Sequence, residues 1–341
     1  MKKLVFFGAI SAAVLSVATF VACNSTEEPS LGVKDAIIGA NESNFDTFML
    51  SVDSLNKSYV NQSRAAISVS EEGEKPTQLV DERWTRNKLV NYADQAGSVI
   101  GGAVGAVGGG IAGGSTGGAA SFALGYLGSR LGEIVYSHLY SSIAKLATGY
   151  QIVNPGYDVA VTTHGNNSDY TFLDSIGVRH NRLMQRMTKY DKKYMYIDLN
   201  NHTLLNEFYV DFMKELNEIY PEVGGFQIST EEKDKLLESS TSVLAIGKSH
   251  LDKKDGKKLF INEVSSLMAN KYNVPLRKIL VFKEFAVSVT TQMDKMDKDD
   301  ISRYTEDLDR VIAESPIDAS DKSSIVSMGQ IATNSNICWK K

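Results

Sequence analysis

The stretch of sequence that decides the fold is residues 95–129, QAGSVIGGAVGAVGGGIAGGSTGGAASFALGYLGS, in which no residue carries a charge. Glycine dominates this stretch, and six glycines recur at every fourth position. They are Gly97, Gly101, Gly105, Gly109, Gly113 and Gly117. Because a spacing of four is close to one helical turn, these positions predict a groove without side chains along one face of a helix.

Such a helix is unstable when it is surrounded by water. Each glycine costs about 1 kcal/mol relative to alanine, so the segment loses on the order of 10 kcal/mol of helix stability. Close contact with another helix, or a bilayer that forbids unsatisfied amides, can restore the helix. The sequence GGSTGG at 113–118 predicts a turn between two arms of roughly 17 and 15 residues. Each arm would be about 25 Å long, which is less than a typical hydrocarbon thickness of about 30 Å.

The period-four glycines resemble the glycine-zipper segments of bacterial envelope proteins, and the resemblance covers only this hairpin. It implies an element that contacts a membrane, or that self-associates as a homo-oligomer through its glycine face. It implies no chemistry. Internal packing of the hairpin against its own protein remains open as the alternative.

The N-terminus predicts export. Met1-Lys2-Lys3 precedes the apolar run 4–22, which is the pattern of a signal peptide. Phe20-Val21-Ala22-Cys23 resembles a bacterial lipobox, although Phe20 departs from the usual leucine. The resemblance implies cleavage before Cys23, acylation of its thiol with groups such as palmitate, and a lipid anchor in the outer membrane, with exposure at the cell surface left open.

The charge balance argues against a nucleic-acid partner. The chain has 36 Lys and Arg against 41 Asp and Glu, and removal of Lys2 and Lys3 with the signal peptide leaves 34 against 41, a net charge of −7. Nucleic-acid binding needs a basic face instead. With Cys23 acylated, Cys338 has no disulfide partner, and we expect it to be a buried apolar residue beside Trp339.

The sequence contains no complete catalytic or metal-binding motif, which predicts no enzyme, no cofactor and no metal site. None of the histidines shows local metal-ligand spacing. They are His138, His164, His180, His202 and His250. One polar cluster, 174–181, stands at the start of an expected helix, and it favours either helix capping or a contact site for a partner.

The fold class is predicted to be mainly α, a helical bundle with a Gly-rich helical hairpin. The expected regions are a signal peptide (1–22), a tether (23–35), an N-terminal helical region (36–94), the glycine-zipper hairpin (95–132), a connecting segment (133–169) and a C-terminal α-helical domain (170–341). Helices are expected at 45–55, 83–92, 174–190, 202–220, 230–247, 260–272, 276–292, 300–314 and 320–338, with one β-like run at 159–163.

Together these features predict a cell-envelope lipoprotein whose glycine hairpin associates with a membrane or with itself. Pore formation and antibacterial activity are further outcomes of that hypothesis. The alternative is a surface-tethered helical binding or structural protein with the hairpin buried internally. The identity of a protein partner does not follow from the sequence.

Overall fold

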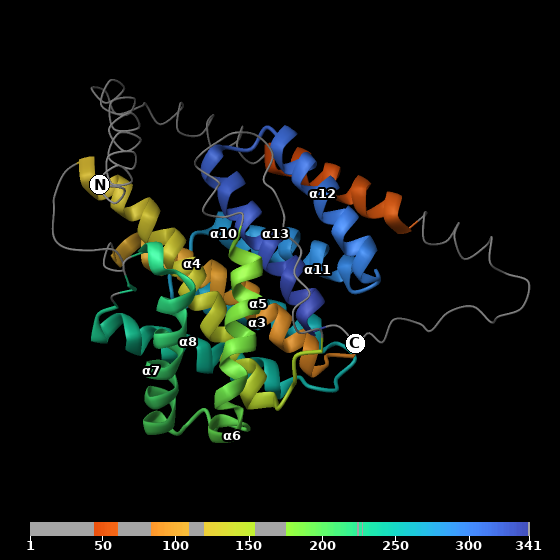
Figure 1. The fold of residues 1–341 in the computed structure, drawn as a ribbon. Coiled ribbons are helices and arrows are strands. Elements are labelled where there is room, and N and C mark those ends of the chain that lie inside the picture. The colour runs from red at the N-terminus through yellow and green to blue at the C-terminus, as the bar shows by residue number, and fades with distance from the viewer. Residues whose placement is uncertain are drawn as a thin grey trace, which may run out of the picture.

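The computed structural model describes residues 44–60, 83–108, 119–153 and 175–339, apart from 224 and 227, and within these ranges the protein is built from helices without a strand (Figure 1). The prediction of a mainly α fold is confirmed. Several sequence-based predictions lie outside the described residues: the signal peptide, Cys23, the turn at 113–118 and the β-like run at 159–163.

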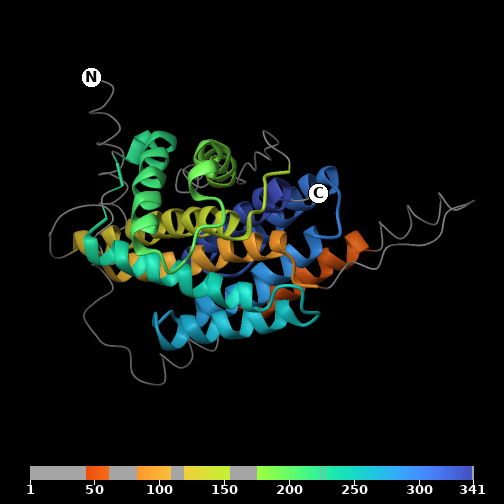
Figure 2. The same cartoon turned by 90° about the horizontal axis from the view of Figure 1, so that it is seen from below.

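Two long helices, α3 (Arg86–Gly108) and α4 (Ala119–Thr148), form an antiparallel pair through the middle of the molecule (Figures 1 and 2). Every residue from 89 to 103 on α3 and from 130 to 148 on α4 is buried. Burial on all sides favours small and apolar residues on every face of a helix, which explains the many alanines and glycines of this pair. None of the described helices combines the length and the apolar character that a membrane span requires.

α4 extends further from the hairpin turn than predicted, and α3 joins the helix expected at 83–92 to the first arm of the hairpin without a break. α3 begins at Arg86, and α4 continues to Thr148, so residues 133–148 are helical and do not form a connecting segment. Gly149 ends α4 in the left-handed conformation, with φ of +65°, which favours glycine at a helix C-terminus. The amide of Tyr150 then donates to the carbonyl of Lys145 at 3.1 Å.

The remaining helices surround the central pair. In chain order they are α5 (Ile176–Met187), α6 (Asp191–Tyr194), α7 (His202–Ile219), α8 (Thr230–Ser249), α9 (Gly256–Asn270), α10 (Leu276–Leu280), α11 (Val287–Met293), α12 (Lys298–Glu314) and α13 (Ala319–Trp339). A π-helical segment, Val281–Ala286, joins α10 to α11. α8 contacts both helices of the hairpin, α13, α10 and the π-helical segment contact α3, and α5 contacts α4, so helices from most of the C-terminal half cover the hairpin directly.

Side-chain capping explains where some of these helices begin. At α8, Ser229 Oγ accepts from the amide of Glu232, and the Glu232 carboxylate accepts from the amide of Ser229 at 2.9 Å, which confirms the predicted capping box. Asp297 caps α12 in the same sense by accepting from the amide of Asp300. The predicted helices after residue 170 all appear, with ends shifted by a few residues.

A helix over residues 44–60 packs on the far C-terminal part of the chain. The rings of Phe48 and Phe285 lie 5.6 Å apart, and the Asn56 amide donates to Ser288 Oγ at 2.9 Å. The buried hydrophobic side chains of the described residues form one core cluster that includes this helix. Cys338 is buried in that core next to Trp339, as the sequence predicts.

Candidate functional site

The period-four glycines of α3 lie at the contact with α4. A Cβ atom added at Gly97 would lie 2.7 Å from the carbonyl oxygen of Tyr136 and 2.9 Å from Cγ of Tyr140. A Cβ atom at Gly101 would collide with the carbonyl oxygen of Gly132. The absence of side chains at these two positions therefore lets the two backbones approach closely.

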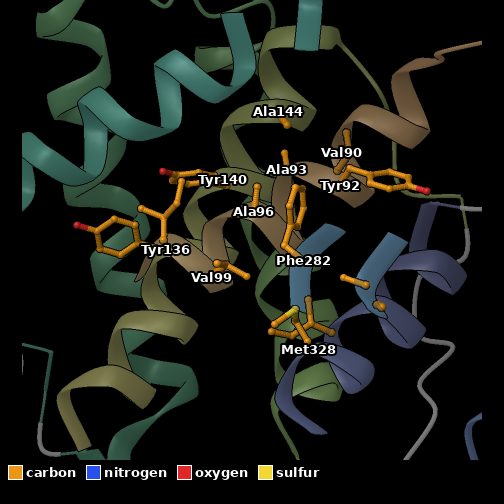
Figure 3. Close-up of a cluster of buried hydrophobic side chains, with 14 of the residues drawn as sticks. Val90, Tyr92, Ala93, Ala96, Val99, Tyr136, Tyr140, Ala144, Phe282 and Met328 are labelled. Atoms are coloured by element: carbon orange, nitrogen blue, oxygen red, sulfur yellow. The ribbon is translucent and has the colours of Figure 1, made fainter. Parts of the chain in front are cut away.

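Of the other four glycines in the row, only Gly105 belongs to a described helix. Gly105 lies near the C-terminal end of α3, and Gly109, Gly113 and Gly117 lie outside the described residues. Figure 3 shows the small side chains Ala93 and Ala144 next to each other at the crossing of the two helices.

The hairpin carries an unusual number of polar residues in its interior. Those with at most 4% of their surface exposed are Asn91, Asp94, Gln95 and Ser98 on α3 and Arg130, Glu133, Ser137, His138, Ser141, Ser142, Lys145 and Thr148 on α4. Burial of a polar or charged group costs free energy unless a partner compensates it. A functional site is one reason to retain such groups, so the interior of the hairpin is a candidate for one.

Three of the buried ionisable groups converge from three helices. Asp94 of α3, His138 of α4 and His180 of α5 have no exposed surface. One metal-ligand atom from each residue lies within 4.8 Å of those of the other two. The rings of His138 and His180 meet edge to face with centroids 5.0 Å apart, and His180 Nε2 lies 3.0 Å from Asp94 Oδ2. We call these three residues the Asp94–His138–His180 cluster.

One polar atom of each residue in the cluster is held by a neighbour. Ser137 Oγ donates to Asp94 Oδ1 across the two helices of the hairpin. His138 Nε2 shares a hydrogen bond of 2.9 Å with Tyr220 Oη at the end of α7. These bonds fix the orientation of the carboxylate and of the imidazole ring.

His180 is held in the same way by the residue that follows it. His180 Nδ1 donates to Asn181 Oδ1 at 3.1 Å, and the Asn181 amide donates to the carbonyl of Asn334 on α13 at 3.2 Å. Because its amide nitrogen is engaged there, Asn181 presents its oxygen to the histidine. This arrangement leaves Nε2 of His180 directed at the cluster.

The remaining polar atom of each residue has no partner outside the cluster within the described part of the chain, and only Asp94 Oδ2 and His180 Nε2 contact each other, at 3.0 Å. These atoms are Asp94 Oδ2, His138 Nδ1 and His180 Nε2, and each has almost no exposed surface. A buried polar group without a partner costs about 1–3 kcal/mol. The cluster therefore contains three buried electron-pair donors or proton sites that face one another.

Burial and charge act in opposite directions on the two histidines. Burial, with a smaller contribution from His180, keeps the pKa of His138 well below its usual value of 6.5, so this imidazole is neutral at neutral pH. Burial also lowers the pKa of His180, but the Asp94 carboxylate more than offsets that effect and raises the pKa above its usual value. In chemical terms, the cluster can hold either a proton between Asp94 and His180 or a cation among all three residues.

Sequence reasoning did not find this cluster, because its residues are far apart in the chain. His138 follows Asp94 by 44 positions, and His180 follows His138 by 42, so no local metal-ligand spacing exists. The one available signal was a charged residue, Asp94, directly before the uncharged glycine stretch.

Two residues of the polar cluster at 174–181, whose first residue Asp174 lies outside the described part of the chain, do not fit the expectation of a capping or surface role. Ser175 precedes α5 but makes no side-chain capping bond. His180 is completely buried and Asn181 is 7% exposed, so neither residue offers a surface for a partner. These side chains are polar because they face the interior cluster and α13.

Comparison of the chain with protein-family models, with curated proteins and with solved structures finds no match.

Proposed function

We propose that this protein is a lipid-anchored binding or structural protein of the cell envelope, in which the glycine hairpin is an internal scaffold. The observation that carries the scaffold role is the contact at Gly97, where an added Cβ would lie 2.7 Å from the backbone oxygen of Tyr136. Glycines that pack against a neighbouring helix of the same chain already have the close contact that a glycine row requires. The burial of residues 89–103 and 130–148 supports the same role.

The anchor in this proposal rests on the lipobox-like sequence that ends at Cys23. Acylation needs the thiol of that residue, and two acyl chains bind a membrane far more stably than one. Replacement of Cys23 by serine should therefore abolish incorporation of labelled palmitate and release the protein from the membrane fraction or leave the uncleaved precursor. Labelled palmitate in Cys23→Ser would refute the anchor.

A second candidate function is contact between the closed end of the hairpin and a membrane. Burial decreases from Ala103, which is 6% exposed, to the partly buried Val104. In both views the Gly108 end of α3 and the Ala119 end of α4 lie at one edge of the molecule (Figures 1 and 2). The sequence between them is uncharged, which is a requirement for entry into a bilayer. Self-association and pore formation would both proceed from this end.

A thiol-protection experiment separates the two candidates. Residues 24–341 are produced without the export signal, with Cys338→Ser removing the buried cysteine and a single reporter placed by Val104→Cys. Val210→Cys, at a position that is 65% exposed on α7, is the matched control. Reaction with a water-soluble thiol reagent is measured with and without liposomes.

The internal scaffold predicts that lipid leaves both reporters unchanged and that the protein does not float with the liposomes. Protection of Val104→Cys by lipid alone, with Val210→Cys still reactive, would instead establish membrane contact by the hairpin. Leakage of a liposome-entrapped dye would then show whether that contact forms pores.

A further inference from the structure

We propose that Asp94, His138 and His180 bind one divalent transition-metal ion inside the helical bundle. The ligand atoms are Asp94 Oδ2, His138 Nδ1 and His180 Nε2, which have no partner outside the cluster within the described residues; Asp94 Oδ2 and His180 Nε2 contact each other, and His138 Nδ1 has no hydrogen bond at all. The proposal concerns the interior of the folded chain and is independent of the lipid anchor.

An ion pair between Asp94 and His180 does not account for the whole cluster. Such a pair, at 3.0 Å, engages two of the three atoms and leaves His138 Nδ1 buried without a partner. A cation is attracted by all three lone pairs at once. The ligand atoms lie within 4.8 Å of one another, a spacing that small side-chain adjustments can close around an ion with bonds of about 2.0–2.2 Å.

The ligand types indicate the class of metal. Two imidazole nitrogens and one carboxylate oxygen suit zinc and the neighbouring first-row transition metals, whereas calcium and magnesium prefer oxygen ligands only. One carboxylate with two neutral imidazoles leaves a divalent ion with a net charge of +1, which is less costly to bury than the free ion. Three protein ligands also leave one coordination position of a tetrahedral ion available.

The neighbours of the cluster have the arrangement of a second coordination shell. Ser137 holds the other oxygen of Asp94, Tyr220 holds the other nitrogen of His138, and Asn181 holds the other nitrogen of His180. Outer-shell hydrogen bonds of this kind fix the tautomer and the direction of each ligand. All three ligands are oriented in this way.

The glycine contact of the hairpin brings two of the ligands together. Asp94 lies three residues before Gly97, and His138 lies two residues after Tyr136, whose carbonyl faces Gly97. Close approach of the backbones at that point allows Ser137 of α4 to reach Asp94 of α3. Because the complete site is buried, we expect the ion to bind as the chain folds.

The test is metal uptake during refolding. The full-length chain, kept in a mild detergent, is unfolded in urea with a chelator and then refolded with or without zinc chloride. We expect one zinc ion per chain by elemental analysis and a higher melting temperature for the zinc-refolded sample. Cobalt chloride in place of zinc should give the visible absorption bands of a tetrahedral ion with nitrogen and oxygen ligands.

Four variants assign the binding to this cluster. Asp94→Asn and His180→Gln each remove a ligand, and they should lower zinc affinity at least about 100-fold and abolish the cobalt bands. Tyr220→Phe keeps the aromatic ring and removes only the outer-shell bond, so it should lower affinity about 10-fold. His250→Gln is the control, because His250 pairs with Glu263 at 3.0 Å away from the cluster, and it should bind as the wild type does.

Three results would overturn the proposal. The first is wild-type protein that refolds with zinc and retains none. The second is unchanged affinity in correctly folded Asp94→Asn and His180→Gln, judged by helical circular dichroism. The third is loss of binding in His250→Gln, which would place the ion elsewhere. If the ligand variants fail to fold, wild-type stoichiometry together with Tyr220→Phe decides, and unchanged affinity in Tyr220→Phe then counts against the site.

Discussion

Replacement of Gly97 by alanine adds one methyl group where α3 packs against a backbone carbonyl and an aromatic ring of α4. The new Cβ would lie 2.7 Å from the carbonyl oxygen of Tyr136 and 2.9 Å from Cγ of Tyr140. An ordinary contact requires about 3.5 Å, so the two helices must move apart by roughly 0.8 Å or tilt. The obstacle includes backbone, which cannot rotate away.

The expected magnitude follows from two opposing contributions. Overpacking in a well-packed core costs about 1–3 kcal/mol, while alanine in place of glycine stabilises a helix by about 1 kcal/mol. Gly97→Ala should therefore lower the free energy of unfolding by about 1 kcal/mol, which is the middle of the overpacking range less the helix contribution.

Gly329 provides a matched control, because it is a buried helical glycine with free space. A Cβ atom there would have Leu308 and Phe285 as nearest neighbours, each at 3.9 Å. Gly329→Ala should therefore gain the helix contribution without the clash and raise the free energy of unfolding by about 0.5–1 kcal/mol. The two substitutions are chemically identical and should have opposite signs.

Urea unfolding followed by circular dichroism measures both values on the same scale. Equal effects of the two substitutions, or stabilisation by Gly97→Ala, would refute the argument that close backbone approach is the reason for glycine at this position. A change in the slope of unfolding with urea would show instead that the native state had loosened.

Two further predictions concern buried charges. Lys145 Nζ, on a side chain that is 1% exposed, pairs with Asp191, which is 15% exposed. Asp191→Asn leaves the buried lysine charge without its carboxylate, so it should lower the free energy of unfolding by about 3 kcal/mol or more. Lys145→Met should lower it clearly less, because water reaches Asp191. The reverse order in urea unfolding would contradict this. Burial raises the pKa of Glu215, but hydrogen bonds from Lys189, Arg186 and Tyr190 offset it and leave that pKa below its usual 4.5. A lowered folded pKa stabilises the protein above the unfolded value, and the contribution is lost as pH falls through the folded value. Unfolding free energies from about pH 7 to about pH 3 should therefore decline in the acid range for wild type and decline less for Glu215→Gln, and parallel curves would show that Glu215 does not contribute.

The sequence predicted the helices well where their ends are determined by local chemistry. The Ser229–Glu232 capping box is an interaction over three residues, and it fixed the start of α8 correctly. The hairpin was predicted too short, because the glycine pattern is confined to residues 97–132 whereas α4 continues to Thr148. Helix length beyond a repeat depends on what covers the helix, and that information is not local.

The Asp94–His138–His180 cluster could not be predicted, for the same reason. Each of its residues is an unremarkable polar residue on its own helix, and only the packing of α3, α4 and α5 brings them within 4.8 Å. The period-four glycines did indicate a close helix contact, but they did not indicate which residues that contact would bring together.

The position of α13 has a consequence for the order of folding during synthesis. α13, residues Ala319–Trp339, contacts both α3 and α5, so the last described helix covers part of the first long one. A growing chain that has already produced the hairpin must wait for more than 200 further residues, the difference between 319 and 108, before that side is covered. Until then the hairpin's buried faces are available to any other glycine-rich helix nearby. Apolar surface that stays uncovered during synthesis favours aggregation, and delayed folding or chaperone binding would limit it.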